Sequence, residues 1–152
     1  MSKIVIGLGN PILSDDAVGL RVLEALRSKN EGRATFMEAN SGGLALLDMV
    51  QGFDEAVLID SIMTGQVPPG TLMVFSLQDF SETRHASNLH DVNFATALEI
   101  GKNHGLKIPD RFTIYAVEVT EVLTFSATMT LEVEVSLQKI ISEIAARENL
   151  LA

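Results

Sequence analysis

Short apolar runs alternate with amphipathic stretches along the whole chain. This order predicts a three-layer α/β/α domain, in which a mostly parallel twisted sheet of about five strands lies between helices on both faces. Residues 71–77 follow Asp60 after only a short turn-containing segment, so we expect them to form an antiparallel edge strand. The runs that read as strands are residues 3–6, 35–38, 55–60, 71–77 and 112–119, and the helical stretches are residues 17–27, 90–104 and 131–147, with a short helix within residues 41–50.

Length and composition fit one domain spanning residues 1–152. The chain has 152 residues, of which 47% are hydrophobic, enough to bury a sheet in a single core. Its formal net charge of −9 argues against a nucleic-acid partner, because binding to phosphates needs a basic surface. The N-terminus lacks a signal segment, and no apolar run approaches the ~20 residues that span a bilayer. We therefore expect a soluble, cytoplasmic protein with no membrane partner.

The stretch "GLGNPILSDDAVG", residues 7–19, connects the first expected strand to the first expected helix. Gly7 and Gly9 match the start of the dinucleotide fingerprint, but Ile12 stands where its third glycine belongs. Gly19 comes too late to replace that glycine, and the chain contains no Gly-Lys-Ser/Thr phosphate loop. The pattern disfavours a nucleotide site and indicates a tight strand-to-helix turn.

Three polar residues of this stretch have structural interpretations. Asn10 is expected to close an Asx-turn through its side chain. Asp15 is expected to lie in the first turn of a helix, where the macrodipole favours an acid. The same explanation is open for Asp16, beside a second one in which its carboxylate binds a positive ligand.

Acidic residues follow or end four of the expected strands. Ligands of open α/β sheets bind at the carboxyl ends of the strands, so these acids are candidates for a site. Asp16 follows the first strand, and Asp60 closes the apolar run "AVLID". For Asp60, a turn or cap acceptor and a ligand are both open. Glu38 and Glu118 are interpreted as supporting or solvated groups.

The chain has three histidines. His85 and His104 stand in polar surroundings and are expected to be exposed. His90 stands at the start of a helix, where a charged imidazole is disfavoured, so it should be neutral, the form that binds metals. One histidine with Asp16 and Asp60 would suit Zn, Ni, Fe or Mn. These three residues form no local motif, so a structural role for His90 stays open.

Segments along nearly the whole chain resemble the corresponding segments of one known family. "GLGNPILSDDAVGLRVLEAL" resembles the G-x-G-N-x-x-x-x-D-[DE]-x-x-G opening of the [NiFe]-hydrogenase maturation endopeptidases. Similar segments follow in the family's order: "EANSGGLALL", "VLIDSI" with "PPGTL", "SNLHDVNFATAL", "IYAVEV" and "LTFSATMTLEVE". Two features depart from the family: the valine after Glu118, where many members carry proline, and Ala127 after Ser126 in place of the commoner Ser-Pro.

The resemblance implies a site and a reaction. The family's catalytic, metal-contacting residues fall on Asp16, Asp60 and His90. The family removes a C-terminal extension from the precursor of the hydrogenase large subunit after nickel insertion. Nickel would thus arrive with the substrate, and the isolated protein is expected to be metal-free or to carry an adventitious divalent ion such as Zn or Cd. The expected partner is that precursor, and the free protein is expected to be a monomer.

The sequence excludes some other functions and leaves two alternatives. The absence of cysteine excludes a cysteine protease and a thiolate metal site, and no G-x-S-x-G elbow is present, so cleavage by water is favoured. One alternative is an assembly factor that recognises the metal-loaded subunit without cleaving it. A second is a peptidyl-tRNA hydrolase-like esterase, which shares a similar opening. Residues 17–30 lack the histidine of that family, and the net charge of −9 opposes tRNA binding.

Overall fold

Within the described part of the chain, five strands form one sheet. The computed structural model describes the backbone of residues 2–40, 44–78 and 89–152, and the side chains of all of these except residues 44 and 89–93. The order across the sheet is β2-β1-β3-β5-β4. All neighbouring pairs are parallel except β4, which pairs antiparallel with β5 at one edge, as expected for residues 71–77. The strands are β1 (Lys3–Leu8), β2 (Thr35–Ala39), β3 (Glu55–Ile62), β4 (Leu72–Phe75) and β5 (Arg111–Glu118).

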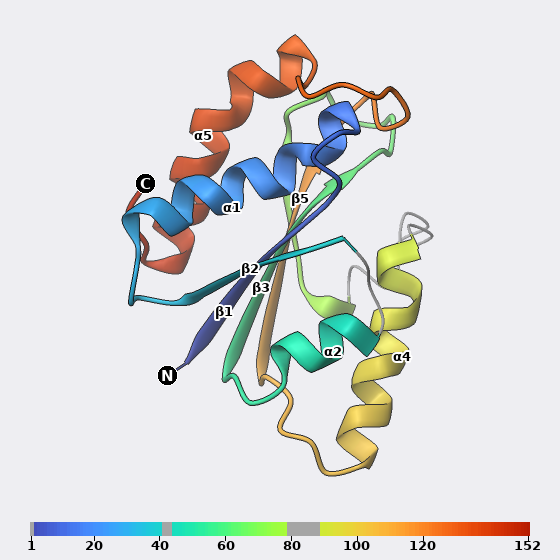
Figure 1. Ribbon diagram of the computed structural model, residues 1–152, viewed down its shortest axis with the longest axis vertical. Helices are drawn as coiled ribbons and strands as arrows, with labels where there is room; N and C mark the ends of the chain where they lie inside the picture. Colours follow the sequence, from blue (N-terminus) through green and yellow to red (C-terminus); the bar gives the residue numbers. More distant parts are fainter. Residues whose placement is uncertain (1, 41–43, 79–88) are drawn as a thin grey trace.

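Helices cover both faces of this sheet. Figure 1 shows α1 and α5 on one face and α2 and α4 on the other, which confirms the expected three-layer α/β/α fold. A short 3-10 helix, η1, precedes α1 directly. The helices whose bounds lie within the described residues are η1 (Ser14–Ala17), α1 (Val18–Lys29), α2 (Leu44–Val50), α4 (Leu89–Asn103) and α5 (Leu131–Glu148). No helix in the described ranges is long and apolar enough to cross a membrane.

The central position of β3 in the sheet explains why its sequence is continuously apolar. Successive side chains of a strand point to opposite faces of the sheet. Leu58 and Ile62 pack in the core under α2 and α4, whereas Val57 and Ile59 pack in the core under α1 and α5. Because both faces are covered, an alternating pattern would leave polar groups buried, and the run "AVLI" avoids this.

The parallel strands place three segments at one end of the sheet. We call this end the carboxyl edge: the ends of β1, β3 and β5 together with the segments that follow them. The loop that follows β1 lies at this edge, and so does η1. Figure 1 shows α4 beginning on the side toward which these strands point. Asp16 in η1, Asp60 in β3 and the first turn of α4 therefore lie toward a common edge of the sheet.

Candidate active site at the carboxyl edge

Glycines allow the loop after β1 to press against the strand ends. Gly9 has φ of +147°, and a Cβ on it would lie 2.0 Å from the carbonyl oxygen of Asp16. A Cβ on Gly19 would lie 2.4 Å from the carbonyl oxygen of Ile59 and 2.6 Å from that of Leu8. These glycines shape a tight strand-to-helix turn, which confirms the interpretation made from the sequence. Gly19 comes too late for a nucleotide fingerprint and serves instead as the close contact between α1 and the sheet.

Asn10 organises the loop around Asp16. Its Oδ1 accepts a hydrogen bond from the backbone N–H of Ile12 at 3.1 Å, which confirms the expected Asx-turn. Its own backbone N–H donates to Oδ2 of Asp16 at 3.0 Å. The half-buried Asp16 is thus fixed by the loop that precedes it.

Asp16 and Asp60 come together at the end of β3. The hydroxyl of Ser61 donates to Oδ1 of Asp16 at 2.9 Å. The backbone N–H of the same serine donates to Oδ1 of Asp60 at 2.8 Å, and Asp60 is only 3% exposed. Two carboxylates that lie 44 positions apart in the numbering thus share one hydrogen-bonding neighbour, Ser61.

His90 is the second residue of α4, and the first turn of that helix faces the carboxyl edge. The side chain of His90 lies outside the described residues, so its part in the site stays a prediction. Among the side chains that the structure describes, no three His, Asp or Glu residues form a metal-binding group. The described part of the candidate site is therefore the pair Asp16 and Asp60.

Asp15 lies in the first turn of η1, as expected, and its side chain has a further role that the sequence did not predict. It is 0% exposed. Its carboxylate accepts hydrogen bonds from the backbone N–H groups of Thr120 at 3.2 Å, Glu121 at 3.1 Å and Thr130 at 2.7 Å. Asp15 therefore ties the loop between β5 and α5 to η1. Its partners are distant in sequence, so no local pattern around Asp15 signals this role.

The remaining acids at this edge support the structure or face solvent. Glu118 is 2% exposed and accepts hydrogen bonds from Thr64 Oγ1 at 2.6 Å, from the Thr64 backbone N–H at 2.9 Å and from that of Gly65 at 3.1 Å. The exposed Glu38 lies 4.0 Å from a guanidinium nitrogen of Arg27. Both interpretations from the sequence are confirmed. His104 is exposed, as expected, and His85 lies outside the described residues.

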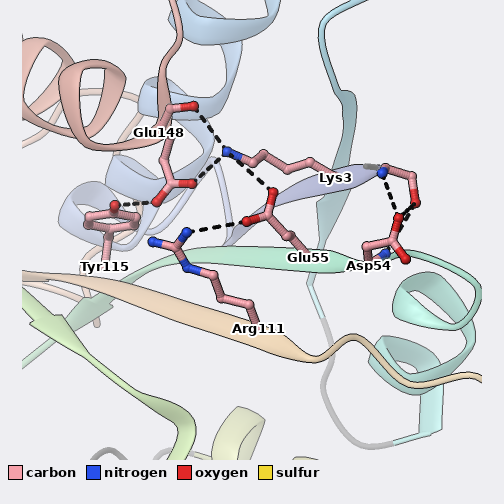
Figure 2. Close-up of polar contacts among 7 residues, drawn as sticks. Lys3, Asp54, Glu55, Arg111, Tyr115 and Glu148 are labelled. Atoms are coloured by element: carbon pink, nitrogen blue, oxygen red, sulfur yellow. Dashed lines mark hydrogen bonds and ion pairs between the residues drawn. The ribbon is translucent and has the colours of Figure 1, made fainter.

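A second polar cluster lies at the opposite, amino edge of the sheet (Figure 2). Lys3 Nζ lies 2.8 Å from Glu148 Oε1 and 3.9 Å from Glu55 Oε2, and Arg111 lies 3.3 Å from Glu55 Oε1. The hydroxyl of Tyr115 donates to Glu148 Oε2 at 2.5 Å. Burial, followed by this hydrogen bond, raises the pKa of Tyr115 above its ordinary value of 10.0. Here the carboxylates are matched by cations and a phenol, so the cluster joins α5 to the sheet.

Comparison with known proteins identifies similar sequences. Residues 20–147 match the family model described as hydrogenase maturation protease. The chain is 30% identical over 76 residues to the hydrogenase 2 maturation protease of Escherichia coli (strain K12), which is 49% of this chain and 46% of that protein. It is 28% identical over 115 residues to the hydrogenase expression/formation protein HupD of Rhizobium leguminosarum bv. viciae, 73% of this chain and 56% of that protein. The chain spans about half the length of the curated relatives it matches.

Solved structures share the fold over nearly the whole chain. The hydrogenase maturating endopeptidase HybD from E. coli has a TM-score of 0.81 at 24% identity, covering 98% of this chain and 94% of that one. The [NiFe] hydrogenase maturation protease HybD from Thermococcus kodakarensis has a TM-score of 0.74 at 20% identity, covering 97% of this chain and 99% of that one. At these identities the likeness establishes the α/β fold.

Proposed function

Because the chain belongs to the hydrogenase maturation protease family, we propose that it is an endopeptidase acting on the large-subunit precursor of a [NiFe]-hydrogenase. The reaction is hydrolysis of one peptide bond, which removes the C-terminal extension of the precursor after nickel insertion. One observation supports this most directly: Asp16 of η1 and Asp60 of β3 both accept a hydrogen bond from Ser61 at the carboxyl edge. Paired carboxylates at this edge suit a cationic feature of the substrate.

The residues have distinct tasks in this proposal. Asp16, Asp60 and His90 contact the nickel that the substrate carries, and the precursor's own cysteines hold that ion from the other side. This chain has no cysteine, so it supplies only oxygen and nitrogen ligands, and the soft thiolate ligands come from the precursor. Contact with the metal positions the scissile bond for attack by water.

The trigger for cleavage follows from this division of ligands. A precursor without nickel lacks the metal bridge, and its thiols face two carboxylates. We expect cleavage of the nickel-loaded precursor and little or none of the apo precursor. Mass spectrometry of the large subunit's C-terminus reports the result directly. Equal cleavage of both forms contradicts a role for the metal in recognition.

Substitution of the three residues tests the assignment. Asp16→Ala, Asp60→Ala and His90→Ala should each abolish processing while the protein remains folded, as monitored by circular dichroism. Asp48→Ala and His104→Ala are matched controls at exposed positions and should process normally. A folded and fully active variant at any of the three positions removes that residue from the site. If the wild type binds the loaded precursor without shortening it, the protein is an assembly factor instead of a protease.

The proposal also covers where and in what form the protein acts. It acts in the cytoplasm, on a single precursor chain, and is a monomer when free. Light scattering of the purified protein, alone and with the nickel-loaded precursor, measures both states. The expected masses are those of one copy of this chain and of a one-to-one complex.

A further inference from the structure

Ser61 lies between the two carboxylates of the candidate site. It is the penultimate residue of β3 and is 5% exposed. Alternation along the strand puts Asp60 on the face covered by α2 and α4, and Ser61 on the face covered by α1 and α5. Asp16 belongs to η1, directly before α1. The two carboxylates therefore reach the tip of β3 from opposite faces of the sheet.

The hydrogen bonds of Ser61 reach both of these groups. Its hydroxyl donates to Oδ1 of Asp16 at 2.9 Å, and its backbone N–H donates to Oδ1 of Asp60 at 2.8 Å. We propose that Ser61 is a positioning residue that holds the carboxylates of Asp16 and Asp60 in one relative orientation toward the nickel carried by the substrate. The inference rests on the proposed function and adds to it a residue that does not itself contact the metal.

The hydrogen bonds to Asp16 are compatible with its binding a cation. A carboxylate oxygen has two lone pairs, so an oxygen that accepts one hydrogen bond retains a second lone pair. Asp16 is held at both oxygens, at Oδ1 by the Ser61 hydroxyl and at Oδ2 by the backbone N–H of Asn10, 3.0 Å away. Such partners set the direction in which a ligating carboxylate points, and loss of one weakens metal binding by roughly 10- to 100-fold.

The hydroxyl is the specific part of this arrangement. The backbone N–H that serves Asp60 is present with any residue except proline at this position. The side chains before Ser61 on the same face of β3, Val57 and Ile59, are apolar and pack in the core. A small apolar residue would therefore suit that face equally well. The hydrogen bond to Asp16, and not packing, therefore accounts for a hydroxyl at this position.

Four variants separate the hydroxyl from the shape of the side chain. Ser61→Ala removes the hydroxyl. Ser61→Thr and Ser61→Val have side chains of similar shape, but only the threonine keeps a hydroxyl. Ser28→Ala is the control, because the Ser28 hydroxyl bonds to the carbonyl of Ala25 on the exposed side of α1. All four are made in the full chain, and their folding is checked by thermal unfolding.

Two measurements are made on each variant. Isothermal titration with Ni²⁺ alone gives the affinity of the isolated protein for the metal. Steady-state cleavage of the nickel-loaded precursor gives KM and kcat separately. Ser61→Ala and Ser61→Val should weaken Ni²⁺ binding and raise KM by roughly 10- to 100-fold, with kcat changed less than about threefold. Ser61→Thr should be within about threefold of the wild type, and Ser28→Ala should be unchanged.

Other outcomes contradict either the positioning role of Ser61 or the proposed function. If Ser61→Ala and Ser61→Val bind Ni²⁺ and process the precursor like the wild type, the positioning role is wrong and the proposed function stands. If Ser61→Thr is as impaired as Ser61→Val, the hydroxyl is not the cause and the role is equally wrong. If the wild type cleaves no precursor but binds Ni²⁺ at least tenfold more tightly than Ser61→Val, the proposed reaction fails while the positioning role holds. If the wild type binds no free Ni²⁺, the KM values decide.

Discussion

Asp15 and Asp16 are neighbours in sequence with different surroundings. The carboxylate of Asp15 is completely buried and receives backbone N–H groups from the loop between β5 and α5. Asp16 is half-buried and is fixed by Asn10 and Ser61. One acid therefore holds the fold together at the carboxyl edge, and the next one faces the candidate site.

Loss of Asp15 should destabilise the protein. Asp15→Ala leaves three backbone N–H groups, on Thr120, Glu121 and Thr130, without this acceptor. Because buried donors without acceptors are costly, we expect the free energy of unfolding to fall by about 3 kcal/mol. Urea denaturation measures it. The exposed control Asp48→Ala should change it by no more than about 0.5 kcal/mol. A loss below about 1 kcal/mol for Asp15→Ala would mean that water replaces the carboxylate.

At the scale of elements, the position of α1 depends on a close backbone contact. The helix begins directly over the ends of β1 and β3, and only a hydrogen atom fits between Gly19 and the carbonyl oxygens of Leu8 and Ile59. This contact keeps η1, and with it Asp16, next to the end of β3. The glycine thus connects the packing of a helix to the geometry of the candidate site.

Gly19→Ala should push α1 away from the sheet. The added Cβ would lie 2.4 Å from a backbone oxygen of β3, which cannot move without distorting the strand. We expect a loss of about 2–3 kcal/mol in the free energy of unfolding, measured in urea, together with reduced processing. Gly101→Ala on α4 is the matched control, since its Cβ would meet the flexible end of Leu47 and helix propensity favours alanine by ~1 kcal/mol. Equal stability of the two variants would rule out the close contact as the cause.

At the scale of the whole molecule, the two edges of the sheet carry different kinds of polar group. The carboxyl edge holds the candidate site, whereas the amino edge is closed by ion pairs among β1, β3, β5 and α5 (Figure 2). Asp54, directly before β3, accepts a hydrogen bond from the Ser2 backbone N–H at 2.8 Å and lies 2.9 Å from Lys107 Nζ. These contacts join the N-terminus and the segment before β5 to the start of the central strand.

Asp54 should make stability depend on pH in the acid range. The Ser2 N–H, and after it the Lys107 ammonium, lower the pKa of Asp54 from 3.8 to about 2. Because the folded-state pKa lies below the unfolded one, the contribution of Asp54 is present above about pH 4 and is lost as the pH falls toward 2. Urea denaturation between pH 5 and pH 2 should show a weaker pH dependence for Asp54→Asn than for the wild type. Asp110→Asn is the exposed control, and identical curves for Asp54→Asn and wild type would contradict the assignment.

The elements of this fold are readable from local sequence because their signals are local. The stripe of residues 131–147 predicts a helix that the structure gives as Leu131–Glu148, and the short connection before residues 71–77 predicts an antiparallel edge strand. The order of strands across the sheet is a different matter. It depends on which strand edges pair and on how the connecting helices pack on the two faces of the sheet, and no single segment carries that information.

The candidate site likewise has some features that the local sequence predicts and others that it does not. Asp16 and Asp60 are recognisable because each is an acid that follows or closes an apolar run, and the glycines mark the turn. The burial of Asp15 and the position of Ser61 between the two carboxylates are decided only by tertiary structure. The Ser61–Asp16 bond spans 45 positions, and the bonds from Asp15 to Thr120 span 105. Periodicity and turn chemistry act over a few residues, whereas these contacts exist only once the strands have aligned.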